Sequence, residues 1–452
     1  AAWTLGRMCE FVYDAITPEV QLPPLVQGLL GALHDQPRIV THCCWALMNL
    51  AEHKGILARL DDPDPPTTPL SPYFETIATQ LITVTQQASN ESNSRTSAYE
   101  ALASLVANSA SDCLQQVSNV LVHVVERQEQ LNGLVHQLVG LDDRNNWAEL
   151  QSNLCSVMIA CVRRLQAGIA PIGDRLMTGL LTLIQNSAKQ PTVLEDAFVA
   201  VGAVIVALEA HFEKYLDAFL PFLVEGLRNH EEYQLCTISV GLVGDLCRSL
   251  GEAATKSSQT LVYALFEDLQ SPVLNRNVKP PILSSFGDIA LAINGHFEPY
   301  LQTAMAVLQQ ASMVQNTGDV NDYEMSEYVN DLREGIAEAY VGIVSGMRIG
   351  GKTELLLPYM EYTIAFVGLV ASDSVDRSET LLRTTIGLLG DIATAFPTGP
   401  VMAQLQQQWV MEYIKVGRSR TNGSETRKTA NWARDTIKKS IGGSGVGTPV
   451  LA

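Results

Sequence analysis

One amphipathic helical pattern recurs along this chain of 452 residues, and it constrains the fold more than any other feature. In residues 233–250, apolar side chains follow one another at three- and four-residue steps, which a helix of 3.6 residues per turn gathers into one stripe. The sequence Gly-Asp-Ile-Ala then occurs at residues 287–290 and again at residues 390–393, each time within a similar apolar segment. The chain therefore reuses one type of helix.

The recurrence has a regular period. We take Gly241 as the reference and call each equivalent residue an anchor residue; it lies on the second helix of a helix pair. Successive anchors are 42 to 56 residues apart, which leaves room for another helix in each interval. Two helices in ~43 residues are typical of HEAT and armadillo repeats, which stack because one pair cannot bury its apolar stripes alone. The anchors are Trp3, Trp45, Glu100, Ser156, Val199, Gly241, Ser284, Ala339, Gly387 and Trp432.

We therefore predict an all-α fold, an α-solenoid (superhelix) of about ten HEAT repeats, each an antiparallel helix pair. The related sequences HFEKYL at residues 211–216 and HFEPYL at residues 296–301 support the register, because they lie two units apart. Residues 1–441 are assigned to the solenoid and residues 442–452 to a flexible C-terminal tail. Because the chain begins inside a second helix, we expect an array truncated at its N-terminus.

Three of the intervals are long, and their additional residues have the composition of exposed loops. Residues 61–72 are rich in Pro and Asp, and residues 128–150 include Gly140 followed by Leu and two Asp. Residues 317–331 carry five acids and two Tyr. We expect these segments to be insertions between helices rather than linkers between domains.

The charge of the chain limits its partners. A net charge of −18 opposes binding to nucleic acid or to an anionic membrane surface, and it favours a basic partner. No apolar run reaches the ~18–20 residues of a membrane span, so we expect none. No grouping of residues suggests catalysis, and we predict a protein that is not an enzyme and needs no cofactor.

The cysteines indicate a compartment rather than a metal. Eight cysteines lie among apolar residues without CxxC spacing, which favours a reducing intracellular environment. His42, Cys43 and Cys44 are adjacent and so point in different directions from a helix, whereas a structural zinc site needs four convergent ligands. We expect no metal site.

Three of the ten anchors are tryptophans. Trp3, Trp45 and Trp432 occupy the same position, which lies off the apolar stripe of the second helix. A tryptophan that core packing does not require, repeated at equivalent positions, is a candidate for ligand binding. The alternative is that each indole packs against the flank of the neighbouring second helix.

Several long segments, in the same order, resemble the C-terminal half of the importin-β family of nuclear import receptors. The resemblance covers residues 1–441 and is weaker in the Pro-rich insertion and around Ala371. The segments are AAWTLGRMCE at residues 1–10, CCWALMNLAE at 43–52, YQLCTISVGLVGDLCRSL at 233–250, VKPPILSSFGDIALAINGHFEPYLQTAMAVLQQAS at 278–312 and TANWARDTIKK at 429–439.

The resemblance implies a binding role for the second helices. In that family they line a concave face that wraps the basic importin-β-binding helix of importin-α, and tryptophans stack against its Arg and Lys side chains. This role falls on Trp3, Trp45 and Trp432. Acidic residues near the anchors are expected to hold the rest of a basic helix. Those that follow a glycine could instead bond to the backbone of the neighbouring repeat or pair with an Arg. The acidic candidates are Glu100, Asp196, Asp245, Asp288, Glu338 and Asp391.

The resemblance also implies a site for the Phe-Gly repeats of nucleoporins, in shallow apolar pockets between adjacent first helices. Tyr215, Phe219, Leu261 and Phe266 are the candidates, and each could equally be a core residue. It further implies that the full-length receptor responds to the GTPase Ran and shuttles between cytoplasm and nucleus. The alternative function is a HEAT scaffold subunit that organises another multiprotein complex.

One motif points to a different function. Residues 346–353 match GxxxxGKT, the loop that cradles nucleotide phosphates. Such a loop needs a preceding strand and a surrounding parallel sheet, so that backbone N–H groups converge on the anion. The segment before Gly346 has the period of a helix, and we therefore do not predict nucleotide binding.

Overall fold

The computed structural model describes residues 1–56, 64–87, 92–314, 323–373 and 377–442. Across these ranges the chain is helical and contains no β-strand. Contacts divide the chain into two compact units, residues 1–215 and 216–452, and each is described by itself. The predicted α-solenoid of helix pairs is confirmed.

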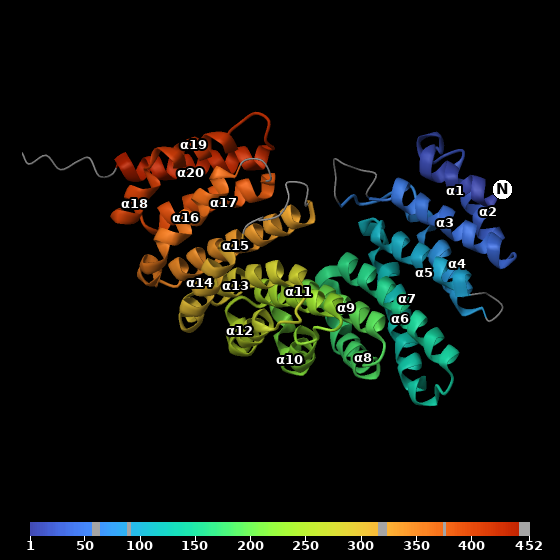
Figure 1. Cartoon of the computed structure of the whole chain (residues 1–452). Coiled ribbons are helices and arrows are strands. Elements are labelled where there is room, and N and C mark those ends of the chain that lie inside the picture. Colours follow the sequence, from blue (N-terminus) through green and yellow to red (C-terminus); the bar gives the residue numbers. More distant parts are fainter. Residues whose placement is uncertain (57–63, 88–91, 315–322, 374–376, 443–452) are drawn as a thin grey trace, which may run out of the picture. The chain divides into compact units, whose positions relative to one another are not determined.

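The first unit is a stack of helix pairs (Figure 1). Its second helices pack directly on one another, in the order α1, α3, α5, α7 and α9, and each of the last four is paired with the first helix that precedes it. The second helices are α1 (Ala2–Phe11), α3 (Pro37–Lys54), α5 (Ser92–Ala107), α7 (Leu141–Leu165) and α9 (Pro191–Leu208). The first helices are α2 (Leu22–Ala32), α4 (Phe74–Gln86), α6 (Leu114–Leu134) and α8 (Gly173–Asn186).

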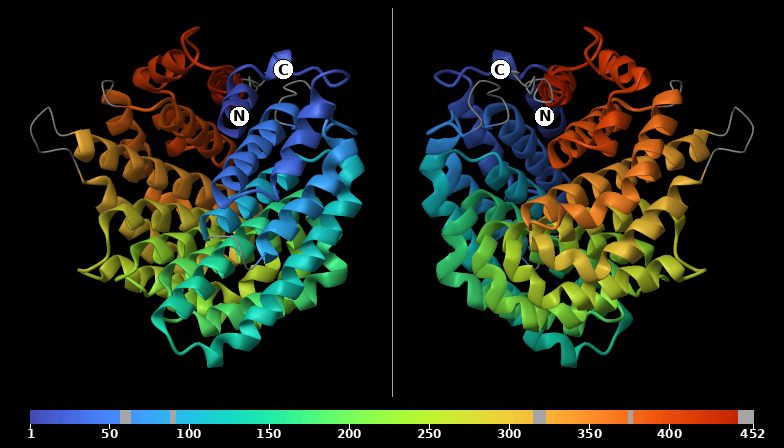
Figure 2. Two further views of the ribbon diagram at one scale, coloured as in Figure 1. Left: turned by 90° about the vertical axis from the view of Figure 1, so that its right-hand side faces the viewer. Right: turned by 90° about the vertical axis from the view of Figure 1, so that its left-hand side faces the viewer.

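The second unit repeats this arrangement, and both views of Figure 2 show its neighbouring helices running side by side. Its second helices are α11 (Tyr233–Leu250), α13 (Lys279–Ile293), α15 (Tyr323–Ile349), α17 (Glu379–Ala395) and α20 (Ser424–Gly442). Its first helices are α12 (Thr255–Gln270), α14 (Glu298–Ser312), α16 (Met360–Ser372) and α19 (Gln408–Gly417), with a short α18 (Pro400–Leu405) before α19; α10 (Glu213–Leu227) begins in the first unit. Every anchor residue lies on a second helix, as the period predicts.

Short 3-10 helices join many of the α-helices. They are η1 (Tyr13–Ala15), η3 (Ser71–Tyr73), η4 (Ser111–Cys113), η5 (Val135–Gln137), η6 (Gln166–Ile172), η7 (Glu209–Phe212), η8 (Gly251–Ala254), η9 (Arg276–Val278), η10 (Asn294–Phe297) and η11 (Thr353–Tyr359).

One turn recurs with the period of the sequence. Four second helices end ten residues after their anchors, at Gln166, Glu209, Gly251 and Asn294, with φ of 49°, 47°, 52° and 51°. A left-handed φ lets the chain leave the helix and enter a 3-10 turn, and it is rare for residues other than Gly and Asn. The backbone therefore repeats the register independently of side-chain packing.

Glycines allow α13 and α15 to approach each other closely. A Cβ atom added to Gly342 would lie 2.3 Å from the carbonyl oxygen of Gly287, and one added to Gly346 would lie 2.1 Å from that of Ala290. Both distances are far below van der Waals contact, so only glycine fits. Gly346, the first glycine of the GxxxxGKT motif, is therefore a helix-packing residue inside α15.

The predicted insertions are only partly loops. Residues 128–150 were expected to form a loop, but α6 and α7 extend through most of this segment, and the expectation is wrong. The added turns pack on each other: buried Trp147 donates from Nε1 to the carbonyl of Leu131 at 3.0 Å, and Gln151 donates to Asn132 at 3.0 Å. The charged and polar residues of this segment made it resemble a loop, although it forms two helices with a shared buried contact surface.

The other two insertions lie partly outside the described residues. Residues 64–72 form a loop that leads into η3, as expected, whereas residues 61–63 are not described. From Tyr323 onward the third segment is helical, because it forms the first turns of α15, so the loop prediction is wrong there. Residues 317–322 and residues 443–452 of the expected tail are outside the described ranges.

Two helical stretches, Leu141–Asn186 and Thr353–Ser372, are long and apolar enough by composition to cross a membrane. This is weak support for a span, because core helices of a folded array have the same composition. The longer stretch is also interrupted by η6, where Gln166 has a positive φ and the chain turns. The absence of a membrane span therefore stays a prediction.

Candidate ligand-binding face

The second helices of each unit form a surface that carries the predicted tryptophans and acidic residues. In the first unit, Trp45 of α3 packs one edge on α1: its atoms Cε3 and Cζ3 lie 2.4 and 2.5 Å from where a Cβ of Gly6 would be. Asn49, one turn further along α3, donates to the carbonyl of Gly6 at 3.3 Å. Trp45 is nevertheless only partly buried, and Trp3 of α1 is 57% exposed.

Trp432 in the second unit repeats this packing. Its ring lies against Gly390 of α17, whose Cβ would be 2.3 Å from Cζ3, and the side chain remains 44% exposed. Gly6 and Gly390 each lie three residues after an anchor of the preceding second helix, so a glycine at this position accommodates the next indole. Trp45 and Trp432 therefore pack on a neighbouring second helix and still retain exposed surface. The role of the three tryptophans in ligand binding stays a prediction.

The charges beside the three tryptophans differ. A residue seven positions later lies two turns along the same helix face. At this position Trp3 and Trp45 have carboxylates, Glu10 and Glu52, whereas Trp432 has Lys439. The position four residues before Trp432 is also basic, at Lys428. Trp3 and Trp45 thus suit a cationic ligand better than Trp432 does.

A groove of about 1070 Å³ runs across α3, α5, α7 and α9 in the first unit. Glu52 and Asp196 contribute its carboxylates, and burial raises the pKa of Asp196. Tyr13 and His53 form a stacked pair at its edge, with ring centroids 4.5 Å apart. Among the acids predicted in this unit, Asp196 lines the groove, while Glu100 is exposed on α5 outside its lining.

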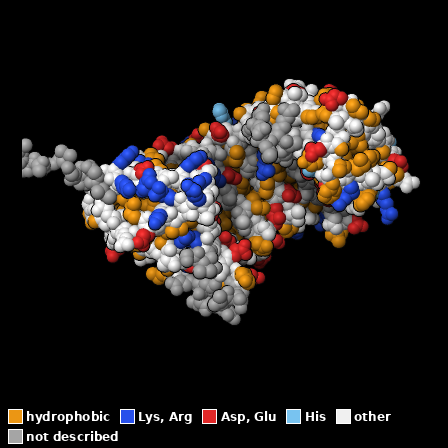
Figure 3. Space-filling view, turned by 90° about the horizontal axis from the view of Figure 1, so that it is seen from above, with side chains coloured by type: hydrophobic (Ala, Val, Ile, Leu, Met, Phe, Trp, Pro, Cys, Tyr) orange, Lys and Arg blue, Asp and Glu red, His pale blue; other side chains and the backbone are white. Residues whose placement is uncertain are grey.

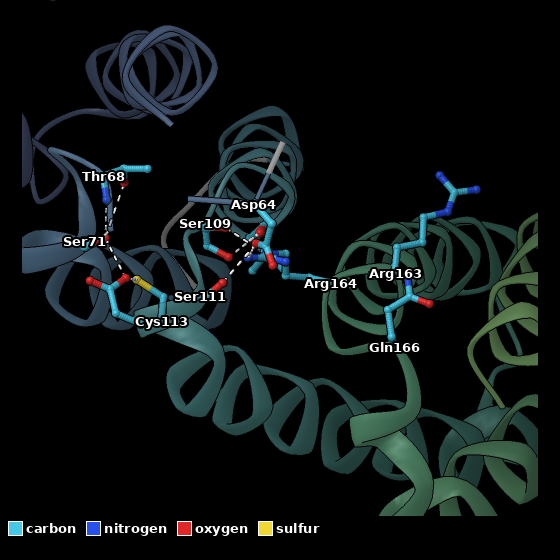
Figure 4. A network of polar contacts seen from close by, with 11 residues as sticks. Asp64, Thr68, Ser71, Ser109, Ser111, Cys113, Arg163, Arg164 and Gln166 are labelled. Atoms are coloured by element: carbon cyan, nitrogen blue, oxygen red, sulfur yellow. Dashed lines mark hydrogen bonds and ion pairs between the residues drawn. The ribbon is translucent and has the colours of Figure 1, made fainter. Parts of the chain in front are cut away.

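Two adjacent arginines of α7 line the groove in different ways (Figure 4). Arg164 bonds to Asp64 at 2.6 Å and to the carbonyl of Ser109 at 2.7 Å, and it holds the pKa of Asp64 below its usual value, as does the hydrogen bond from Ser111. Arg163 points away from this network and is exposed. Arg164 therefore ties the Pro-rich segment to α7, and Arg163 is the cation that a ligand would meet.

In the second unit, two of the predicted acids pair with the same arginine, one within its own helix and one between neighbouring repeats. Arg248 of α11 donates from Nη2 to Asp245 at 2.8 Å and from Nη1 to Asp288 of α13 at 3.0 Å. This was the alternative to ligand contact left open for the Gly-Asp sequences, and the geometry realises it for both residues. Glu338 is exposed and accepts a hydrogen bond from Ser284 at 2.8 Å.

Asp391 differs from the other two Gly-Asp carboxylates. Among the described residues it has no hydrogen-bond or ion-pair partner, and burial raises its pKa to about 6, although Arg348 acts in the opposite direction. It follows Gly390, on which Trp432 packs. Because burial destabilises its ionised form and none of the described residues pairs with it, the Asp391 carboxylate is available to pair with a cation.

The residues predicted for a nucleoporin pocket are core side chains. Phe219 and Leu261 are 0% and 1% exposed, Tyr215 donates to Asp174 at 2.7 Å, and Phe266 packs on Phe286 with centroids 4.9 Å apart. A pocket of the expected kind, of about 430 Å³ between first helices, lies instead at α16 and α19. The prediction did not include its residues, and the unassigned Trp409 was the available sequence signal. The pocket is lined by Gly368, Ala371, Ser372, Trp409, Glu412, Tyr413 and Val416.

The GxxxxGKT motif is engaged in packing. The segment before it is the helix α15, and Lys352 donates to the carbonyl of Gly295 at 2.9 Å and to Glu298 at 2.6 Å. Cys43 and Cys44 are fully buried, and burial raises their pKa to about 11 and about 12, which disfavours the thiolate that binds metal.

Comparison with known proteins identifies relatives of the whole described chain. A family profile described as "Importin subunit beta-1-like, TPR repeats" matches residues 24–418. The importin subunit beta-1 of Schizosaccharomyces pombe is 42% identical over 97% of this chain, which covers 50% of that protein. The chain spans about half the length of the curated relatives it matches.

Solved structures give the same result. A crystal structure of importin beta in an ammonium sulfate condition has 40% identity and a TM-score of 0.92, with 97% of this chain and 50% of that chain covered. A structure of a Kap95:Nup1 complex has 30% identity and a TM-score of 0.78, with 98% and 50% covered.

Proposed function

Because the chain belongs to the importin subunit beta-1 family, we propose that it is part of a nuclear import receptor and binds the basic importin-β-binding helix of importin-α, or a cargo of similar chemistry. The protein acts by binding, without catalysis or a cofactor, and shuttles between cytoplasm and nucleus. The response to Ran belongs to the full-length receptor in this proposal. The binding surface is the second-helix face with its tryptophans.

The observation that carries the proposal is the pairing of an exposed indole with a carboxylate two turns along the same helix. Trp3 with Glu10 and the partly exposed Trp45 with Glu52 have this arrangement on neighbouring second helices, α1 and α3. Glu10 also pairs with Arg7 at 3.0 Å, an exposed contact that a ligand cation can replace at little cost. An Arg or Lys over the indole face gains ~0.5–2 kcal/mol, and the carboxylate favours the next cation of the ligand. A basic helix offers cations at the same spacing, so one helix can engage both members of a pair.

The test is titration of a basic amphipathic helical peptide, followed by fluorescence anisotropy of a label on the peptide. We expect binding that weakens steeply with salt, because the contacts are charged and partly exposed. Trp3→Ala with Trp45→Phe should weaken binding at least about threefold, since loss of the cation–π contact at Trp3, worth ~0.7 kcal/mol, corresponds to that ratio and Phe makes a weaker contact than Trp at position 45. Phe is used at position 45 because it keeps an aromatic ring on Gly6.

Trp409→Ala is the matched control, because it removes an indole from a first helix of the other unit. It should leave affinity for the basic peptide unchanged. Loss of affinity in this control, or no binding of the wild-type protein at low salt, would refute the proposal. The second of these results would favour the HEAT scaffold that meets a folded partner.

A second binding function is carried by the pocket between α16 and α19. We propose that it accepts the Phe side chain of a nucleoporin Phe-Gly repeat, and the Kap95 relative crystallised with Nup1 supports this class of partner. Trp409 and Tyr413 provide aromatic walls, while Gly368 and Ala371 leave the space between them open. In this proposal the four core residues predicted earlier support the first helices from within and do not touch the Phe-Gly repeat. They are Tyr215, Phe219, Leu261 and Phe266.

Gly368→Ala tests the pocket without disrupting the fold. A Cβ at this position would lie 3.7 Å from Cη2 of Trp409, in ordinary contact, so it narrows the pocket with little strain. We expect weaker binding of a Phe-Gly repeat peptide to Gly368→Ala and to Trp409→Ala, and unchanged binding to Trp3→Ala. Equal affinity of Gly368→Ala and wild type, measured by NMR titration of a labelled repeat peptide, would exclude this pocket.

A further inference from the structure

The C-terminal helices carry a charge opposite to that of the chain. Of its 30 Lys and Arg residues, eight lie between residues 415 and 439, together with only two of its 48 acids. Figure 3 shows Lys and Arg side chains gathered on the part of the surface formed by α19 and α20. Seven of the eight are exposed and Arg434 is partly exposed. A strongly acidic protein thus has one concentrated basic surface.

The basic residues form an ordered stripe rather than a random group. Arg427, Arg434 and Lys438 are separated by seven and four residues, which places them on one flank of α20. Arg418, from the end of α19, joins this flank, because its Nε donates to Asn431 at 2.8 Å. We call these four residues the basic flank. Trp432 lies on the opposite flank of α20.

The acids of this region leave most of the positive charge available. Glu425 pairs with Lys428 at 2.7 Å and Asp435 pairs with Arg434 at 2.7 Å. Within the described residues, Arg418, Arg427 and Lys438 form no ion pair with a carboxylate, although Lys438 is near enough to Asp435 to help lower the pKa of that carboxyl. Three members of the basic flank are therefore free to pair with an external anion.

The loop that presents Arg418 is fixed by hydrogen bonds. Asn422 donates to the carbonyls of Val416 and Gly417 at 2.8 and 3.2 Å. Glu379 of α17 accepts from the amide of Gly423 at 2.7 Å and from the hydroxyl of Thr426 at 2.6 Å. A surface whose backbone is already ordered loses less entropy on binding than a mobile one.

We propose that the basic flank binds a short acidic peptide segment of a partner protein. Its length on α20, from Arg427 to Lys438, is about 16 Å at the rise of an α-helix, which matches about five extended residues or three helical turns. Carboxylates of Asp and Glu side chains pair with guanidinium groups in this geometry. This inference is independent of the proposed binding of basic cargo, which uses other residues.

Nucleic acid fits the surface less well. A polyanion longer than the flank would meet the acidic remainder of the chain, whose charge repels it. Proteins that hold single strands also offer exposed aromatic rings for base stacking, and the four residues of the flank include none. A short acidic segment avoids both problems.

The experiment uses the full chain and a fluorescein-labelled peptide of about twelve residues, rich in Asp and Glu, which spans the flank. Fluorescence anisotropy is measured at low and at physiological salt. We expect binding at low salt that weakens as salt is raised, and about a tenfold or greater loss in Arg427→Glu/Lys438→Glu. The control Arg38→Glu/Lys189→Glu changes the net charge by the same amount at exposed residues of the first unit, and it should bind like wild type.

Three results would overturn the proposal. They are no binding of the acidic peptide by wild type at low salt, equal losses in the two double variants, and tighter binding of a single-stranded oligonucleotide with the same number of charges. Circular dichroism of each variant confirms that the helices are intact. Failure of this experiment leaves the basic-peptide titration unaffected, because neither double variant alters Trp3 or Trp45.

Discussion

Replacement of Gly346 by alanine tests the packing of α15 against α13. The added Cβ would lie 2.1 Å from the carbonyl oxygen of Ala290 and 2.6 Å from its carbonyl carbon. Both contacts are with backbone, which cannot rotate away as a side chain can. Restoring ordinary contact, which begins at 3.4 Å, requires the two helices to separate by roughly 1 Å.

The expected loss of stability follows from two opposing effects. Overpacking of this kind costs ~1–3 kcal/mol, and the rigid backbone on both sides favours the upper end. Alanine in place of a helical glycine returns ~1 kcal/mol of helix propensity. We therefore expect Gly346→Ala to lower the free energy of unfolding of the second unit by about 2 kcal/mol. For a unit of this size, that corresponds to a melting temperature lower by about 4–8 °C.

Gly241→Ala is the matched control, because Gly241 lies in α11 of the same unit and a Cβ there would meet nothing within 4 Å. It should gain ~1 kcal/mol and melt about 2–4 °C higher than wild type. Thermal unfolding followed by circular dichroism at the helical band measures both. The reasoning fails if the two variants melt at the same temperature, or if Gly346→Ala melts above wild type.

Three further predictions concern single groups. Burial raises the pKa of Asp391 to about 6, so its contribution to stability is present below its ordinary pKa and is lost as pH rises through 6. Asp391→Asn should therefore be more stable than wild type by roughly 3 kcal/mol at pH 7.5, and urea unfolding should show this difference shrinking towards pH 4. The same variant should bind the basic peptide less tightly. Gly251→Ala should lower the free energy of unfolding by ~1 kcal/mol, because a side chain is strained at the φ of +52°. Glu209→Gly, at a φ of +47°, relieves the same strain and should leave stability unchanged or raise it in the same unfolding assay. Lys352→Met should lower the free energy of unfolding by ~1 kcal/mol, because it loses the hydrogen bonds to Gly295 and Glu298. ATP should not shift the melting temperature of wild type. An ATP-dependent shift that vanishes in this variant would instead support nucleotide binding.

The period of the apolar stripe was sufficient to locate the repeats. All ten anchors, from Trp3 to Trp432, lie on second helices, because a stripe at 3.6-residue spacing has to be buried wherever it occurs. Loop-like composition was a poorer guide. Residues 128–150 contain Gly and several acids, which suggested a loop. Trp147 and Gln151 nevertheless join α7 to α6 through buried hydrogen bonds, which local polarity does not reveal.

The proposed binding residues divide in the same way. Position off the stripe correctly indicated that Trp3 and Trp432 are exposed, and spacing by seven residues could have identified Glu10 and Glu52. The pairing of Arg248 with Asp288 could not be predicted from the sequence, because the two residues are 40 positions apart and meet only when α11 and α13 stack. The core positions of Phe219 and Leu261 likewise depend on which neighbours cover them.

The sequence by itself determined the all-α class, the register of the repeats and the residues that face away from the core. These features depend on the local spacing of apolar residues, which is present within each helix by itself. Only the tertiary structure decided how closely second helices approach, which carboxylates are neutralised and where a pocket opens between α16 and α19. Each of these depends on side chains from different repeats, whose contact is a property of the stack and not of either segment alone.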